Sequence, residues 1–79
     1  SYTPIALKLL PEEFTMSQIQ KLYEAILDEK LDKRNFRKKV CEMPYFVKTG
    51  KIDKSCSKRG AAIYVFDYNM YQEHRDFHL

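Results

Sequence analysis

Cysteine, glycine and long apolar runs are scarce in this 79-residue sequence, which has two cysteines, two glycines and no tryptophan. Cys41 and Cys56 are too few for a disulfide framework, and nothing in the sequence resembles a signal peptide. We therefore expect free thiols and a cytoplasmic location. The longest apolar run extends only from Ala61 to Phe66, whereas a membrane-spanning helix needs about 20 apolar residues. No membrane partner is expected.

The charge is distributed unevenly along what is, by its length, one small domain. The formal net charge is +3, but residues 30–59 hold eleven Lys/Arg and three acidic residues, a net charge of +8. The remainder carries −5. Such a separation is typical of a surface that binds a polyanion. It does not by itself distinguish DNA from RNA, heparin or an acidic membrane.

The most basic segment has the pattern of a short helix. Asp32 is a suitable N-cap, because its carboxylate accepts hydrogen bonds from the free N–H groups of a helix that follows it. Pro44 cannot continue a helix, so we predict a helix over about 33–43. Its apolar face carries Phe36, Val40 and Met43. Its opposite face carries Arg34, Arg37 and Lys38, with Asn35 to one side.

A helix of this kind suits the major groove of DNA. Arginine can bind guanine with two hydrogen bonds, and asparagine can do the same to adenine. An ordinary surface helix with a solvated basic face has the same pattern, and this segment alone leaves both interpretations open.

Two helices are predicted before the basic one. Thr3 and Pro4 are typical of a helix start, and Pro11 would end that helix; its apolar residues are Ile5, Ala6, Leu9 and Leu10. Thr15 and Gln18 then form a capping box, with Phe14 and Ile19 as a hydrophobic staple. The apolar stripe of this second helix is Ile19, Leu22, Tyr23, Ile26 and Leu27. A short connector with Leu31 in the core then leads to the basic helix, as in a helix-turn-helix.

The second half of the chain predicts a β-hairpin. Residues 45–49 and 62–66 have the β-branched and aromatic content of strands, and the polar, basic segment 50–60 is predicted to be the loop. A helix is expected over about 68–75. This order predicts an α+β fold of the winged helix-turn-helix type: three helices, a two-stranded wing and a short tail helix. Both alternating sets of the return strand are apolar, so we expect the tail, or a domain outside this chain, to cover its second face.

The sequence also resembles a known family. The run LLPEEFT-x-SQ-x-QKLYEAIL, the run LDKRNFRKKV and the strand end Tyr64-Val65-Phe66-Asp67 are similar to the C-terminal winged-helix domain of the Nudix-related transcriptional regulators. The resemblance covers about residues 5–73. It implies a bacterial repressor whose N-terminal Nudix-like domain senses ADP-ribose-type nucleotides and whose winged helix binds operator DNA as part of a homodimer. Residues 1–79 would then be the C-terminal DNA-binding domain of a longer protein.

The resemblance also implies which side chains contact double-stranded DNA. On the recognition helix these are Lys33, Arg34, Asn35, Arg37 and Lys38, and on the basic wing they are Lys58 and Arg59. Lys54, in the same basic loop, is predicted as a further DNA contact. This sequence departs from the family at the wing, where Arg59-Gly60-Ala61-Ala62 replaces a frequent glycine-arginine-proline-alanine. The Nudix motif itself does not occur here, so the sensing domain would lie outside this chain.

Catalysis and metal binding are not expected. Cys41, Cys56, His74 and His78 lack the close cysteine pair of a zinc finger, and no nucleophile has a base oriented by a third group. We therefore predict no cofactor and no enzyme activity in this chain.

Two other functions remain as alternatives. One is a winged helix that assembles with proteins, which would need an apolar exposed face on the third helix. The other is an accessory C-terminal domain of a Nudix hydrolase similar to ADP-ribose pyrophosphatases. RNA binding is disfavoured, because aromatic side chains for base stacking are not evident among the basic residues.

Overall fold

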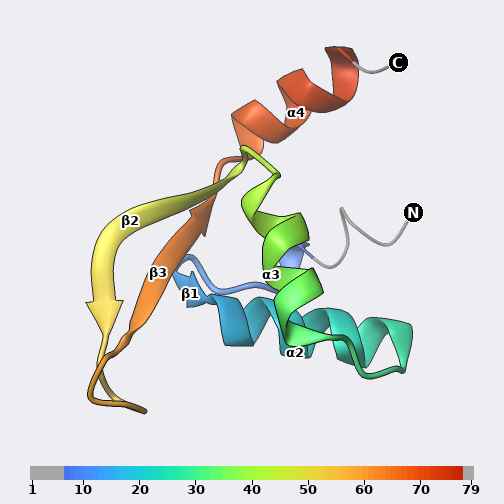
Figure 1. Cartoon of the computed structure of the whole chain (residues 1–79). Helices are drawn as coiled ribbons and strands as arrows, with labels where there is room; N and C mark the ends of the chain where they lie inside the picture. Colours follow the sequence, from blue (N-terminus) through green and yellow to red (C-terminus); the bar gives the residue numbers. More distant parts are fainter. Residues whose placement is uncertain (1–6, 78–79) are drawn as a thin grey trace.

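The computed structural model describes residues 7–77, which form a small α+β fold. Figure 1 shows the sheet on one side, α2 and α3 against it, and α4 at the end away from the hairpin tip. The elements are β1 (Phe14–Thr15), α2 (Met16–Leu27), α3 (Lys33–Cys41), β2 (Phe46–Asp53), β3 (Ala61–Phe66) and α4 (Tyr68–Phe77). The helix start predicted at Thr3 and Pro4, and His78, lie outside the described residues.

The sheet has three strands in the order β1-β3-β2, all antiparallel. The predicted two-stranded hairpin is present as β2 and β3, and β1 adds a third strand that the sequence did not predict. Phe14 and Thr15 pair with Tyr64 and Ile63, so Phe14 is a strand residue as well as the residue before the cap of α2. A strand of this length is too short to show an alternating pattern in the sequence.

Both helix starts follow the prediction. In the capping box of α2, the backbone N–H of Thr15 donates to Gln18 Oε1 at 2.8 Å, and the N–H of Gln18 donates to Thr15 Oγ1 at 3.3 Å. At α3, Asp32 Oδ2 accepts from the N–H of Asn35 at 2.9 Å. The helix ends at Cys41, before the predicted end near 43. A hydrogen bond between residues three apart replaces the α-helical pattern there, since the Met43 N–H donates to the carbonyl of Val40 at 3.0 Å.

The core lies between the sheet, the first turns of α2 and the end of α3. Its buried residues are Phe14, Met16, Ile19, Val40, Tyr45, Phe46, Tyr64 and Tyr71. Leu27, predicted to be in the apolar stripe, is 42% exposed, whereas Met16 was not predicted and is 5% exposed. The reason is visible in Figure 1, where the N-terminal end of α2 lies against the sheet and the C-terminal end extends past it.

The hairpin is more regular than predicted. The segment 50–53, assigned to the loop by the sequence, continues β2, and Ile52 and Asp53 pair with Ala62 and Ala61. A register shift after Lys48 accommodates Gly50, which has a φ of 88°. Two hydrogen bonds of the Thr49 hydroxyl stabilise this irregularity. The hydroxyl donates to the carbonyl of Ile63 at 3.0 Å and accepts from the Lys51 N–H at 3.1 Å. The loop proper is therefore shorter than 50–60.

The tail helix packs on aromatic side chains at the base of the hairpin. The Tyr71 ring lies 5.1 Å from that of Tyr45 and 5.4 Å from that of Phe66, between centroids. Phe66 shares a strand face with buried Tyr64, whereas Ile63 and Val65 on the other face are half-buried. At Tyr71 the tail therefore extends the core instead of covering the second face, contrary to the prediction.

Candidate nucleic-acid interface

The exposed face of α3 is held by two apolar contacts on its other side. Val40 is 2% exposed, and the half-buried Phe36 ring lies 5.7 Å from the Tyr23 ring of α2, between centroids. The predicted contact residues of this helix are all exposed: Lys33, Arg34, Asn35, Arg37 and Lys38. The structure therefore places these five side chains together on one helix, facing away from the core.

The turn before α3 is fixed by side chains of α2. The backbone N–H of Leu31 donates to the Glu24 carboxylate at 2.9 Å, and Gln20 Nε2 donates to the Leu31 carbonyl at 3.0 Å. The Leu31 N–H holds the pKa of the Glu24 carboxyl below its ordinary value of 4.5. Leu31 is half-buried. These bonds, together with the Asp32 cap, set where α3 begins and hence which way its basic face points.

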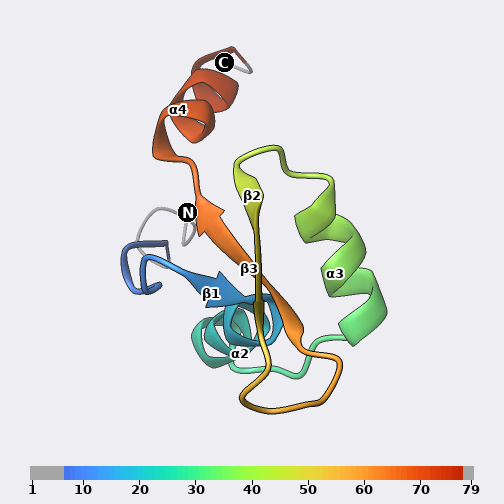
Figure 2. The same ribbon diagram turned by 90° about the vertical axis from the view of Figure 1, so that its left-hand side faces the viewer.

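The wing tip carries the remaining predicted residues, all of which are exposed: Lys54, Lys58 and Arg59. The tip is closed by short-range hydrogen bonds, since Asp53 Oδ1 accepts from the Ser55 N–H at 2.9 Å and Ser57 Oγ accepts from the Gly60 N–H at 3.1 Å. Figures 1 and 2 both place the tip and the N-terminal end of α3 at the end of the molecule away from α4. The structure thus gathers the two basic groups at one end.

One basic residue of the hairpin, Lys51, forms an ion pair with an acidic residue. Lys51 Nζ lies 2.7 Å from the Glu13 carboxylate, which raises the pKa of Lys51. No ion pair within residues 7–77 involves Arg34, Arg37 or Lys38. Their charges are therefore available to an external anion.

An open cleft of about 260 Å³ lies between α2 and α3 and is lined by residues of both helices. It is lined by Met16, Ser17, Gln20, Lys21, Glu24, Lys33 and Arg37. Ser17 and Lys21 were not predicted as contact residues, because they lie outside the highly charged segment 30–59. Their i, i+4 spacing after the capping box places them on one helix face, and that signal could have identified them.

The cysteines and the helices show no other kind of site. Cys41 and Cys56 are free and exposed. Within residues 7–77, no group of three or more His, Cys, Asp or Glu is arranged to hold a metal ion. None of the helices described is long and apolar enough to cross a membrane.

The protein-assembly alternative needs an apolar exposed face on α3, and that face is basic. The large exposed apolar side chains of the described residues lie elsewhere: Leu9, Leu27, Ile52, Tyr68 and Met70.

Comparisons with known proteins agree with this geometry. The model of a family described as "NrtR DNA-binding winged helix domain" matches residues 6–66. A curated relative, the ADPR responsive transcriptional repressor NtrR of Acinetobacter baylyi, is 35% identical over 65 residues, which are 82% of this chain and 26% of the relative. The crystal structure of Shewanella oneidensis NrtR complexed with a 27mer DNA is similar with a TM-score of 0.70 at 22% identity, covering 80% of this chain and 28% of that chain. That likeness confirms the winged-helix fold.

Proposed function

Since this chain belongs to the NrtR DNA-binding winged helix domain family, we propose that it binds double-stranded DNA sequence-specifically as the DNA-binding part of a bacterial transcriptional repressor. The observation that carries this proposal is the exposed basic face of α3, whose N-terminal end lies at the same end of the molecule as the basic wing tip. The match to this family confirms the family assignment that the DKRNFR run indicated.

Base recognition is assigned to the first half of α3. Recognition helices usually read base edges with residues near their N-terminal end, while other basic residues contact phosphates. Arg34 and Arg37 are exposed in this half, and a guanidinium can form two hydrogen bonds with guanine. Asn35 is exposed beside them and offers the adenine pairing. Lys33 and Lys38 bind phosphates in this arrangement, and Lys39 makes no base contact.

The wing supplies phosphate contacts. Lys54, Lys58 and Arg59 are exposed on a tip that short hydrogen bonds close. A basic loop of this kind adds affinity and fixes the orientation of the domain, while carrying little sequence information.

The parent protein is proposed to join this domain to an N-terminal Nudix-like domain, to act in the cytoplasm as a homodimer, and to respond to an ADP-ribose-type nucleotide. Two facts support this: the curated relative is named as an ADPR-responsive repressor, and this chain spans about a quarter of its length. The chain itself is proposed to have no enzyme activity. An accessory domain of a Nudix hydrolase is the second candidate, and the same coverage would fit it.

The test is a fluorescence-anisotropy titration of the 79-residue chain with duplex DNA at several salt concentrations. Because binding releases counterions, log K falls by roughly 0.9 per neutralised phosphate for each tenfold increase in salt concentration. We expect duplex binding at low salt with a slope that indicates several phosphates. The Lys58→Glu, Arg59→Glu double variant should flatten the slope and leave the base preference unchanged. A folded sample that binds no duplex at about 50 mM salt contradicts the proposal.

A further inference from the structure

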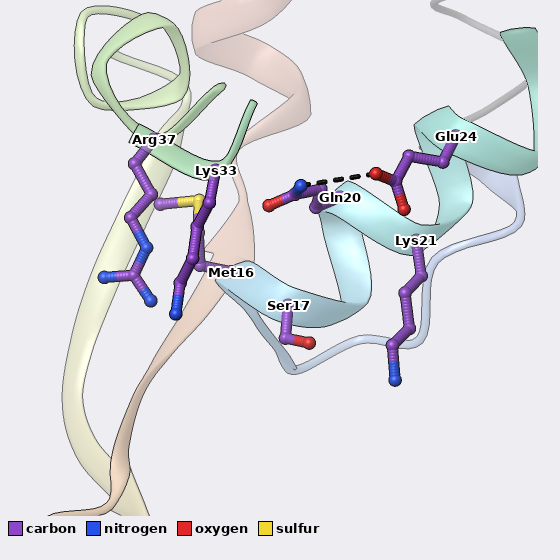
Figure 3. Close-up of a pocket in the computed structure, with 7 residues that line it drawn as sticks. All are labelled: Met16, Ser17, Gln20, Lys21, Glu24, Lys33 and Arg37. Carbon is purple, nitrogen blue, oxygen red and sulfur yellow. Dashed lines mark hydrogen bonds between the residues drawn. The ribbon is translucent and has the colours of Figure 1, made fainter. Parts of the chain in front are cut away.

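Leu31, the last residue before the cap of α3, has both of its backbone polar groups bound by side chains of α2. Its N–H donates to the Glu24 carboxylate at 2.9 Å, and its carbonyl accepts from Gln20 Nε2 at 3.0 Å. Gln20 Nε2 also donates to the Glu24 carboxylate at 3.4 Å, the hydrogen bond drawn in Figure 3. The two side chains, four residues apart on one face of α2, therefore form a single bridge to the connector. We term Gln20, Glu24 and Leu31 the α2–Leu31 bridge.

The bridge acts directly before the point at which α3 begins. Asp32 follows Leu31 and caps the helix, since its carboxylate accepts from the Asn35 N–H at 2.9 Å. Packing of the Phe36 ring on Tyr23 also joins the two helices, but apolar packing is not directional, whereas hydrogen bonds depend on angle. With its N–H and its carbonyl both bound, Leu31 fixes the direction in which the chain enters α3.

The Glu24 carboxylate takes part in the bridge as an anion. The Leu31 N–H is the main cause that holds the pKa of Glu24 below its ordinary value of 4.5, although desolvation raises it, and Gln20 and two lysines lower it further. Glu24 is therefore ionised at neutral pH. A hydrogen bond to an ionised acceptor is about twice as strong as one between neutral groups, so the Glu24 bond contributes more to the bridge than the Gln20 bond.

Recognition of bases needs α3 to point in one direction within narrow limits. The helix has nine residues, which at a rise of about 1.5 Å per residue make a length of about 13 Å. A tilt of about 10° at its first residue would displace the backbone at Arg37 by about 1 Å and the far end by about 2 Å. Side chains that bind in a fixed geometry must be held within about 0.5 Å. Lysine tolerates such a shift, because its ammonium is a point charge on a flexible stem. A tilt would thus impair base recognition and leave phosphate contacts nearly intact.

We propose that Gln20 and Glu24 are positioning residues for DNA recognition. Through Leu31 they fix the direction of α3, so that the guanidinium of Arg34 or Arg37 meets a base edge with both of its hydrogen bonds. The sequence preference of the domain is then determined in part by two α2 side chains that act without touching DNA. This role rests on the proposed function and deepens it, because it assigns part of the specificity to residues outside the basic segment 30–59.

The first measurement is a paired titration with the highest-affinity duplex selected from a random pool and with a scrambled duplex of the same length. Glu24→Ala is compared with Glu29→Ala, which removes the same charge from an exposed residue of the connector, outside the bridge. We expect Glu24→Ala to lower the ratio of specific to non-specific binding about three- to tenfold, part of the roughly five- to hundredfold that one bidentate base contact contributes. Gln20→Ala should lower it less. Glu29→Ala should leave it unchanged, and a loss equal to that of Glu24→Ala would overturn the proposal.

A double-variant cycle separates positioning from general destabilisation. Glu24→Ala is combined with Arg→Lys at whichever of Arg34 and Arg37 lowers the ratio by itself. Because the bridge acts through that arginine, we expect Glu24→Ala to change the ratio by less than about twofold in the Arg→Lys background. An equal fold-loss in both backgrounds, or no loss from either arginine variant, overturns the positioning role. Gln20→Ala, which keeps the Glu24 bond, takes the place of Glu24→Ala if circular dichroism shows that variant unfolded.

A measurement without DNA distinguishes failure of this role from failure of the proposed function. Residual dipolar couplings report the direction of each backbone N–H bond, and hence the angle between α2 and α3, in the free chain. We expect that angle to change in Glu24→Ala and not in Glu29→Ala, while the couplings within α3 remain those of a helix. An unchanged angle overturns the positioning role, even if the domain binds DNA. If the wild type binds no duplex, the proposed function fails and this role fails with it.

Discussion

The Phe36→Ala substitution tests how α3 is attached to the rest of the fold. Phe36 is half-buried, and its ring lies 5.7 Å from that of Tyr23, between centroids. Truncation of a fully buried phenylalanine costs about 3–5 kcal/mol, so half burial accounts for about 2 kcal/mol. Loss of the aromatic pair adds about 0.5–1 kcal/mol. We expect a total loss of about 2–3 kcal/mol, out of a stability on the order of 4–12 kcal/mol for a domain of this size.

The assay is thermal unfolding followed by circular dichroism. A loss of this size lowers Tm by about 10–20 °C in a small domain. Phe36→Leu keeps most of the apolar contact and should lose about 1 kcal/mol. Lys39→Ala, at an exposed position of the same helix, should change the stability by less than about 0.5 kcal/mol. A Tm drop below about 4 °C for Phe36→Ala would refute the assigned helix phase.

Two further predictions concern the turn before α3 and the wing. The pKa of Glu24 is lowered by the Leu31 N–H, so the stability from this contact is present above the ordinary pKa of 4.5 and is lost as the pH falls through the lowered value. Urea unfolding at several pH values should show wild type more stable than Glu24→Gln near neutrality, with the gap closing in acid; a constant gap contradicts the assigned contact. Gly60 has a φ of 78°, and a Cβ there would collide with Ile52, whereas Gly50 has a φ of 88° and open space around it. Gly50→Ala should therefore cost about 1–2 kcal/mol from backbone strain alone, and Gly60→Ala should cost more; equal losses would show that the wing tip relaxes freely.

The features that the sequence predicts well are local. The capping box of Thr15 and Gln18 and the Asp32 cap depend on residues three apart, and the structure has both. The basic face of α3 follows from helix phase, because Val40 and Phe36 point inward and the arginines outward. The order of helix, helix, strand, strand and tail helix is also confirmed within the described residues.

The features that the sequence does not predict depend on tertiary contacts. The pairing of Phe14 with Tyr64 joins residues fifty apart, and no local pattern indicates it. Continuation of β2 through Gly50 depends on the register shift and on the bonds of Thr49. Burial of Met16 and exposure of Leu27 follow from where α2 crosses the sheet. Likewise, the cleft that places Ser17 and Lys21 beside Lys33 exists only after the two helices have packed together.

The central claim is that α3 reads bases and does not only attract phosphates. Arg34→Lys and Arg37→Lys keep the charge but lose the guanidinium that can form two hydrogen bonds with guanine. The measurement is a paired titration of each variant with the highest-affinity duplex selected from a random pool and with a scrambled duplex of the same length. We expect at least one variant to lose about 1–3 kcal/mol of specific over non-specific binding, with the salt slope nearly unchanged. If both variants keep the wild-type ratio, α3 contributes charge alone and the assignment of base recognition to it is wrong.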